Sequence, residues 1–383
     1  MTKTIIGELI TKMKDQISVR QTACFCTISL LALKLIALPS ILFDKSNSSG
    51  LVVAITLIAF DFLMLFLYLK IKEKFPNQSL YELILNYFGK FIAKFVYIFI
   101  TLFFILKICM LINEGVMYMQ DVVDENCSLI VFLITYLPVL TALSFSGLRN
   151  TARTCEFGFV FILIGLIICL FLSEISLTFG EIGPIFVRSF KNIFNSCFEL
   201  NFWFSDFLFV IVLADKIKIE KNFKRRIMSF VFFVTIILVI LYLVYFRLFR
   251  VTAFLHKTAI EDIMQYNRNI GNVGNVDIIA ILVYLFILYF QGALYMNCLN
   301  TCYEKIFEYK NNYHSLLAVN LLIIFVQYFI FYNFEKIYNF ILIYFKYFGI
   351  FLWIIIPAFY IFLLIFSKGE KYGKKRKKNI VKN

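Results

Sequence analysis

The chain has 383 residues, of which 61% are apolar and 19% aromatic, with 48 Phe residues. Soluble domains average roughly 45–50% apolar residues, so this composition excludes an ordinary soluble protein and indicates a chain that a bilayer solvates. The formal net charge of +14 does not indicate nucleic-acid binding. Its densest cluster, residues 374–378, directly follows the last apolar stretch, as cytoplasmic anchors on anionic lipids do.

Ten apolar stretches follow one another along the chain, and each approaches the roughly 20 residues that a transmembrane helix needs. We therefore predict an all-α polytopic membrane protein, with about ten transmembrane helices in a single domain over residues 1–383. Nine or eleven crossings stay open as alternatives. The predicted spans are 20–43, 50–70, 89–112, 128–146, 153–173, 194–214, 227–248, 275–300, 314–332 and 337–366.

The basic residues alternate between the two sides of this topology. With both termini in the cytoplasm, the cytoplasmic segments hold 26 Lys and Arg residues and the external segments hold 8. Cytoplasmic loops carry such an excess of positive charge in membrane proteins. The distribution therefore predicts a multi-pass protein of the cell membrane with cytoplasmic N- and C-termini.

Two segments between the spans have helical character of their own. Ser79 and Glu82 have the spacing of a capping box, which predicts a short helix on the cytoplasmic side. The longer external segment 247–276 is mixed in polarity, and we expect it to lie along the membrane surface.

The usual signatures of an enzyme are absent from the sequence. Neither a phosphate-binding glycine loop nor a nucleophile elbow is present. The nine Cys residues lack the partners of a metal site, and the two His residues fall on opposite sides of the predicted membrane. We predict no enzymatic activity, no metal and no cofactor.

Two charged residues in the first two spans lie at matching depth. Lys34 and Asp61 are each about 14–15 Å beneath the external surface at 1.5 Å per residue. Charges in the membrane are costly and usually face a partner or a cavity. An ion pair between them is one interpretation. In the other, Lys34 extends toward the headgroups and Asp61 is protonated or reaches water.

The sixth span carries polar groups near its centre. Asn201, Ser205 and Asp206 suggest a helix that lines a wet cavity, although Asn201 and Ser205 would also suit a polar face packed on a neighbouring helix. Gln291 lies inside the eighth span, where an amide binds a ligand or joins two helices equally well. Lys34, Asp61, Asn201, Ser205, Asp206 and Gln291 are the candidate ligand-binding residues.

Three polar residues near the end of the third span are expected to act as interfacial anchors rather than as site residues. They are Lys107, Asn113 and Glu114. Their predicted position close to the external surface is the reason for this expectation.

A series of short motifs follows one another along the chain, mainly in its first half. They are Ile17-Ser18-Val19-Arg20-Gln21, Phe75-Pro76, Phe88-Gly89-Lys90, and Gly147-Leu148 followed by Ala152-Arg153 and Glu156. In their order and spacing these motifs resemble those of the B subunit of spore germinant receptors, the spore germination permease-like family of endospore-forming bacteria. Relatives have Leu where this chain has Phe88.

The resemblance implies a fold of the amino acid–polyamine–organocation superfamily. That fold has two inverted repeats of five helices, here about residues 18–173 and 194–366, followed by a basic cytoplasmic tail over 367–383. The first and sixth helices would be interrupted at mid-membrane, with ligand between the breaks. The implied function is sensing of a small polar, amino acid-like germinant in the spore inner membrane, with A-type and C-type receptor subunits as partners.

One departure concerns the first break, where relatives usually have Gly. Residues 31–36 contain none, so either the helix is less broken or Lys34 supplies the positive charge that a helix end otherwise provides. Two other functions stay open. One is secondary transport of amino acids or small solutes, with Lys34 or Asp61 in ion coupling. The other is a scaffold subunit that binds no ligand.

Overall fold

The computed structural model describes residues 16–76, 78–174, 189–268, 277–309, 312–355 and 357–363. Over these residues the chain is built from helices, and the one β-type contact is an isolated bridge between Ile17 and Ile217. Helices satisfy every backbone polar group within one segment, which lipid demands of any spanning structure.

The helices of the first half begin at the first predicted span. In chain order they are α2 (Val19–Leu31), η1 (Ala32–Lys34), α3 (Leu38–Ser46), η2 (Asn47–Ser49), α4 (Gly50–Lys74), α5 (Leu80–Phe88), α6 (Lys90–Val122), α7 (Leu129–Phe145) and α8 (Leu148–Glu174).

The second half repeats the pattern of short, broken and long helices. Its elements are α9 (Phe190–Leu200), η3 (Asn201–Phe204), α10 (Leu208–Val212), η4 (Ala214–Lys216), α11 (Phe223–Phe249), η5 (Arg250–Leu255), α12 (Ala259–Arg268), α13 (Asp277–Phe307), α14 (Asn312–Phe325), η6 (Val326–Ile330), α15 (Phe334–Phe340) and η7 (Ile341–Phe345). The final candidate span, Phe334–Leu363, contains α15 and η7.

Each predicted span corresponds to a helical segment of the structure. Among the described residues, 7 helices are long and apolar enough to cross a membrane, and the bent pair α2–η1 and α3 forms a further candidate. The shorter apolar helix α7 and the divided segment α9–η3–α10 coincide with the remaining two stretches. The all-α polytopic fold is confirmed, whereas ten crossings remain a prediction.

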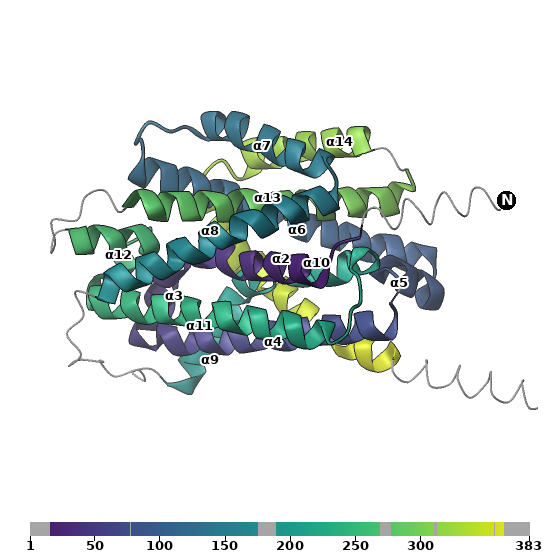
Figure 1. Ribbon diagram of the computed structural model, residues 1–383, viewed down its shortest axis with the longest axis horizontal. Coiled ribbons are helices and arrows are strands. Elements are labelled where there is room, and N and C mark those ends of the chain that lie inside the picture. The colour runs from purple at the N-terminus through teal and green to yellow at the C-terminus, as the bar shows by residue number, and fades with distance from the viewer. Residues whose placement is uncertain are drawn as a thin grey trace, which may run out of the picture.

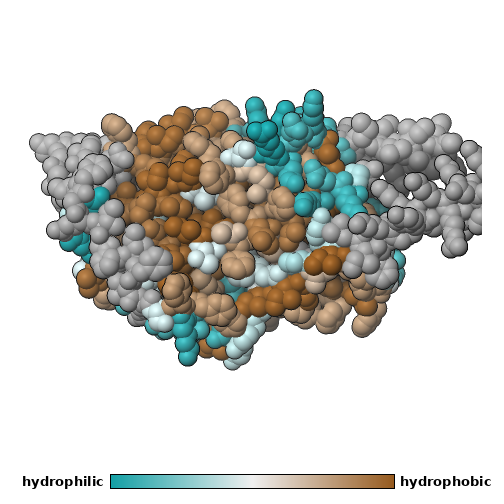
Figure 2. Space-filling view, turned by 90° about the horizontal axis from the view of Figure 1, so that it is seen from below, coloured by the Kyte–Doolittle hydropathy of each residue, from teal (hydrophilic) through white to brown (hydrophobic). Residues whose placement is uncertain are grey.

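The outer surface suits a bilayer. Brown, hydrophobic side chains cover much of the face in Figure 2, and hydrophilic side chains gather toward parts of its edge. Phe157 and Phe171 of α8 are 71% and 70% exposed. Large aromatic side chains exposed in such number would be unfavourable in water, but they are in their preferred solvent among lipid tails.

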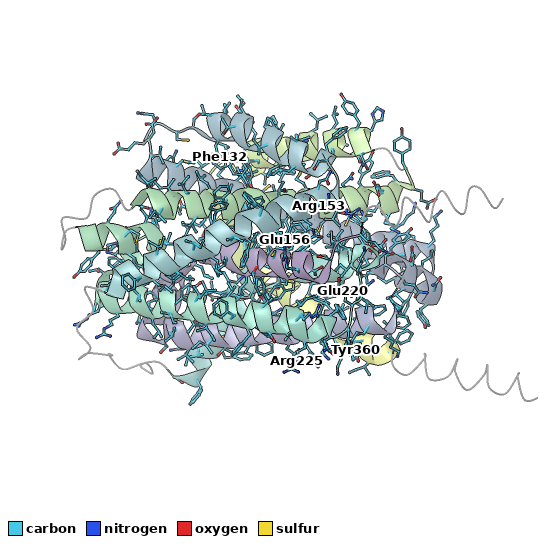
Figure 3. The ribbon with its side chains drawn as sticks, in the orientation of Figure 1. Phe132, Arg153, Glu156, Glu220, Arg225 and Tyr360 are labelled. Carbon is cyan, nitrogen blue, oxygen red and sulfur yellow. The ribbon has the colours of Figure 1, made fainter. Side chains whose placement is uncertain are left out.

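The bundle has two distinct ends. Helix α5 lies at one end and α12 at the other (Figure 1). Arg153, Glu220 and Arg225, from loops predicted to share the cytoplasmic side, lie in the half nearer α5 (Figure 3). The arrangement agrees with the predicted alternation of loops, and the assignment of the α5 end to the cytoplasm stays a prediction.

Both predicted segments outside the spans are helical. Ser79 and Glu82 form the expected capping box at the start of α5, with Glu82 N donating to Ser79 Oγ over 3.2 Å and Ser79 N donating to Glu82 Oε2 over 3.1 Å. The segment predicted to be external contains α12, which has one apolar and one polar face.

The two halves of the chain have a similar order of elements. A broken segment comes first in each, followed by a long helix of 25 residues (α4) or 27 residues (α11), and then by one of 33 (α6) or 31 (α13). Helix α6 packs against α13, and α7 packs against α14. This order suits a duplicated five-helix unit, while the inverted relation of the halves stays a prediction. The predicted tail, 367–383, lies outside the described residues.

Candidate functional site

The first span is broken despite its lack of glycine. Helix α2 tightens into η1, and the chain bends by 56° before α3. Pro39, at the start of α3, has no backbone N–H to donate and disfavours a continuous helix through the residues before it. Of the two alternatives drawn from residues 31–36, a less broken helix is therefore wrong.

Backbone groups freed by this break find partners on other elements. Tyr242 of α11 donates a hydrogen bond of 2.7 Å to the carbonyl of Lys34, and Ala259 N donates to the carbonyl of Ile36 over 3.3 Å. Unsatisfied carbonyl groups would be costly at this depth, so these contacts stabilise the bend.

The sixth span is broken as well. Helix α9 ends at Leu200, η3 follows, and α10 begins only at Leu208. Ser205 and Asp206 lie in the gap and are buried. The interruption of the first and sixth spans, expected from the family resemblance, is present in the structure.

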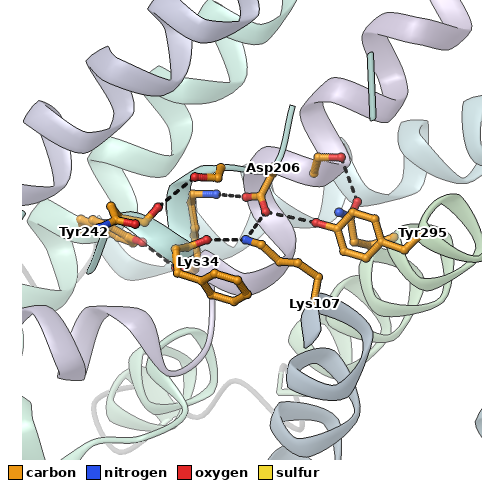
Figure 4. A network of polar contacts seen from close by, with 10 residues as sticks. Lys34, Lys107, Asp206, Tyr242 and Tyr295 are labelled. Atoms are coloured by element: carbon orange, nitrogen blue, oxygen red, sulfur yellow. Dashed lines mark hydrogen bonds and ion pairs between the residues drawn. The ribbon is translucent and has the colours of Figure 1, made fainter. Parts of the chain in front are cut away.

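A buried ionic cluster joins the two breaks (Figure 4). Lys34 of η1 forms an ion pair with Asp206 Oδ2, and Lys107 Nζ of α6 lies 2.6 Å from Asp206 Oδ1. Tyr295 of α13 donates a hydrogen bond of 3.1 Å to the same Oδ1 atom. All three charged side chains are at most 1% exposed. We call Lys34, Lys107 and Asp206 the ionic cluster.

The ionic cluster has more bases than paired acids. Among the described residues, Asp206 is the one acidic group within ion-pair distance of Lys34 or Lys107. Lys107 completes its contacts by donating to the carbonyl of Phe202 over 2.6 Å. Removing a paired charge from a buried site is expensive, because the remaining charge stays desolvated.

Aromatic rings surround the two ammonium groups. Lys34 Nζ lies 4.9 Å from the centre of the Phe204 ring, and Lys107 Nζ lies 4.6 Å from that of Phe202. Both rings belong to η3, so the broken sixth span supplies the carboxylate, one carbonyl and two aromatic faces. Cations desolvated over aromatic faces gain about 2 kcal/mol or more.

The predicted ion pair between Lys34 and Asp61 is not formed, and this interpretation is wrong. Lys34 turns to Asp206 across the bundle, because the bend after η1 brings it to the break in the sixth span. Asp61 of α4 is only 1% exposed, and its two carboxylate oxygens have no hydrogen-bond partner among the described residues. Of the two interpretations of this pair, the ion pair is excluded, and a protonated Asp61 stays a prediction.

The remaining candidates are near the breaks but outside the ionic cluster. Asn201 donates to the carbonyl of Lys346 over 2.7 Å and so joins η3 to the last span. Ser205 donates to the carbonyl of Asn201 over 3.2 Å, and Gln291 accepts from Ser29 of α2 over 3.0 Å. The contacts of Asn201 and Gln291 correspond to the helix-joining alternative, whereas the Ser205 contact stays within its own span.

The expectation of interfacial anchoring for Lys107, Asn113 and Glu114 is wrong. These side chains are 0%, 3% and 0% exposed. The physical reason is helix length: α6 continues to Val122, whereas the predicted span ended at 112. At 1.5 Å per residue, this places Lys107 roughly 22 Å below the end of the helix.

Two of the motifs that carried the resemblance have structural roles. Ser18 and Gln21 form the capping box of α2, with Ser18 N donating to Gln21 Oε1 over 2.9 Å. Arg20 forms an ion pair with Glu156 of α8, which is labelled in Figure 3. The first motif thus starts α2 and attaches it to the motif that follows the fourth span.

Comparison with known proteins agrees with this arrangement. Residues 16–337 match a permease-like membrane family described as spore germination protein. The chain belongs to this family. Its match extends through α13 and α14, well beyond the first-half motifs, and includes both broken spans and all three residues of the ionic cluster. No curated protein is significantly similar to the chain.

Proposed function

We propose that this spore germination protein is the germinant-sensing subunit of a receptor in the spore inner membrane. A small polar, amino acid-like germinant would bind between the two broken spans. The signal would pass to A-type and C-type partner subunits. The observation that carries the proposal is the ionic cluster, because it holds the two breaks together through the contact between Lys34 and Asp206.

A charged ligand at this position would change the conformation by competing for the ion pairs of the ionic cluster. A carboxylate would compete with Asp206 for the two ammonium groups, and an ammonium group would compete with Lys34 for Asp206. Either exchange weakens the connection between η1 and the gap before α10. A ligand that binds the separated form better shifts the population toward it.

Secondary transport is the second candidate, and Asp61 and Glu114 favour it. Both carboxyl groups are buried in long apolar helices, and neither has a hydrogen-bond partner among the described residues. Buried acids of this kind serve proton relays in transporters. Uptake of labelled solute by proteoliposomes that contain the purified chain separates the two functions.

The test of the receptor function is germination of spores that lack the gene. Loss of optical density is followed across a panel of amino acids, sugars and salts. We expect a selective loss of response to one class of germinant, restored by the wild-type gene. An unchanged response to every germinant, in spores without a redundant receptor, would contradict the proposal and favour transport.

A third outcome concerns the scaffold alternative. If deletion abolishes the response but no germinant stabilises the purified chain against heat, the chain assembles its partners without binding ligand. A ligand that binds only the folded state raises the unfolding midpoint by mass action. Ligand-dependent stabilisation therefore separates sensing from assembly.

A further inference from the structure

A cavity lined by charged, polar and apolar side chains lies apart from the ionic cluster, on the side that the predicted topology places outside. Its volume is about 490 Å³, within the range of small-molecule sites. The walls come from both ends of the chain, with Ser40 and Asp44 of α3, Asn113 of α6, and Glu335 and Tyr338 of α15 among the lining residues. We call it the vestibule.

The charges of the vestibule determine the chemistry of its ligand. Asp44 and Glu335 supply two carboxylates, and Lys257 supplies one ammonium group. Neither carboxylate forms an ion pair among the described residues. Lys336 follows Glu335 in the sequence, but its Nζ lies over the Tyr332 ring, 4.0 Å from the ring centre. Acidic groups therefore predominate on the wall.

The vestibule communicates with the ionic cluster through aromatic rings. Tyr338 lines the cavity, and its ring centre lies 5.9 Å from that of Trp203 in η3. Trp203 follows Phe202, whose carbonyl accepts the hydrogen bond from Lys107. A ligand in the vestibule that moves Tyr338 would therefore also move η3, whose residues contact the ionic cluster.

We infer that the vestibule is a binding site for small molecules that carry an ammonium group, such as amino acids and amines. Asp44 and Glu335 hold the ammonium group, and Lys257 attracts a carboxylate where the ligand has one. The site precedes the mid-membrane position on the path from outside. This inference rests on the proposed function for its physiological meaning, but its binding chemistry is tested separately.

The two Trp residues of the chain allow a direct measurement. Trp353 stacks on Phe60 with ring centres 5.0 Å apart and is not part of the vestibule. The variant Trp353→Phe leaves Trp203 as the one indole, beside Tyr338. Fluorescence of this full-length protein in nanodiscs then reports ligands that disturb the vestibule.

The probes are the amino acids other than tryptophan and tyrosine, which fluoresce themselves, together with putrescine and choline. Lactate is the matched partner of alanine that lacks the ammonium group. We expect a saturable change in Trp203 fluorescence with at least one ammonium probe and none with lactate. The double variant Asp44→Asn, Glu335→Gln should weaken that binding about tenfold or more, because charge-assisted hydrogen bonds are lost. Glu199 is a half-buried acid outside the vestibule, and its Oε2 lies 3.9 Å from Lys45 Nζ. The control variant Glu199→Gln should leave binding unchanged.

Three results would overturn the inference. They are a lack of response to every ammonium probe, equal binding of alanine and lactate, and binding that the double variant does not weaken. The germination phenotype of the deletion is independent of all three, so the vestibule can fail while the receptor function stands. Conversely, probe binding to a chain whose deletion leaves germination intact would retain the vestibule and remove the receptor function.

Discussion

Lys107 and Asp206 form a 2.6 Å ion pair, although 98 residues separate them and they lie in different halves of the chain. The contact fixes the long helix α6 against the break in the sixth span. Lys34 reaches the other oxygen of the same carboxylate. One acid therefore holds three elements together.

Asp206→Asn should lower the stability of the protein by about 3–5 kcal/mol, since it leaves two buried ammonium groups without an ionised partner. The measurement is the unfolding midpoint of the purified chain in detergent, together with its level in the spore membrane. Glu199→Gln is the control on the surface. A normal midpoint with reduced germinant response would instead assign Asp206 to ligand binding alone.

Lys34→Met and Lys107→Met should each destabilise less than Asp206→Asn, because Asp206 keeps one lysine. The double variant leaves Asp206 charged and unpaired. We expect it to lose more stability than the two single variants lose together. Adding Asp206→Leu to the double variant should recover stability, since buried ion pairs are often replaced by apolar groups without cost. Additive losses would show that the three residues do not act as one cluster.

Asp61→Asn should change stability by no more than about 1 kcal/mol, in contrast to Asp206→Asn. A buried carboxyl without partners is expected to be neutral, and an amide has the same size and charge. Infrared difference spectroscopy provides the direct measurement. The carbonyl band of a protonated carboxylic acid should disappear in the variant, and its absence from the wild type would show that Asp61 is ionised.

Gly349→Ala should destabilise the packing of the last span against η3. A Cβ at this position would overlap the side-chain amide of Asn201, which donates to the carbonyl of Lys346. In an Asn201→Ala background the added methyl group meets less of an obstacle, so the second substitution should cost less. An equal loss in both backgrounds, measured as the unfolding midpoint, would exclude the clash.

Asp262 on α12, outside the candidate spans, gives a pH-dependent stability. Burial raises the pKa of its carboxyl, against the opposing effects of His256 and the hydrogen bonds from Thr258. Because the folded state holds the proton more tightly, this stabilising contribution is complete below the unfolded pKa of about 3.9. It is lost as pH rises through the raised folded pKa.

Asp262→Asn should therefore make the free energy of unfolding less dependent on pH in the acidic range. It should also raise stability at neutral pH relative to the wild type. The test is the thermal midpoint measured from about pH 4 to about pH 7, the range over which a carboxyl group with a raised pKa titrates. An unchanged slope would show that Asp262 does not titrate over this range in the folded protein.

The sequence by itself determined that the protein is an all-α polytopic membrane protein. The thickness of the hydrocarbon core sets the length of a transmembrane helix, and the sequence shows that length as a run of apolar residues. It also located the helix start at Ser79, since a capping box uses residues only three positions apart. The cost of charge in the membrane is what marked Lys34 and Asp206 as candidate site residues.

Tertiary structure decided the partners. Lys34 could be matched with Asp61 by depth alone, but the 56° bend after η1 turns it to Asp206. Lys107 joined the ionic cluster because α6 extends ten residues beyond the end of its predicted span. Helical periodicity fixes depth and face within one segment, whereas the contacts between segments depend on bends and packing that arise only when the whole bundle forms.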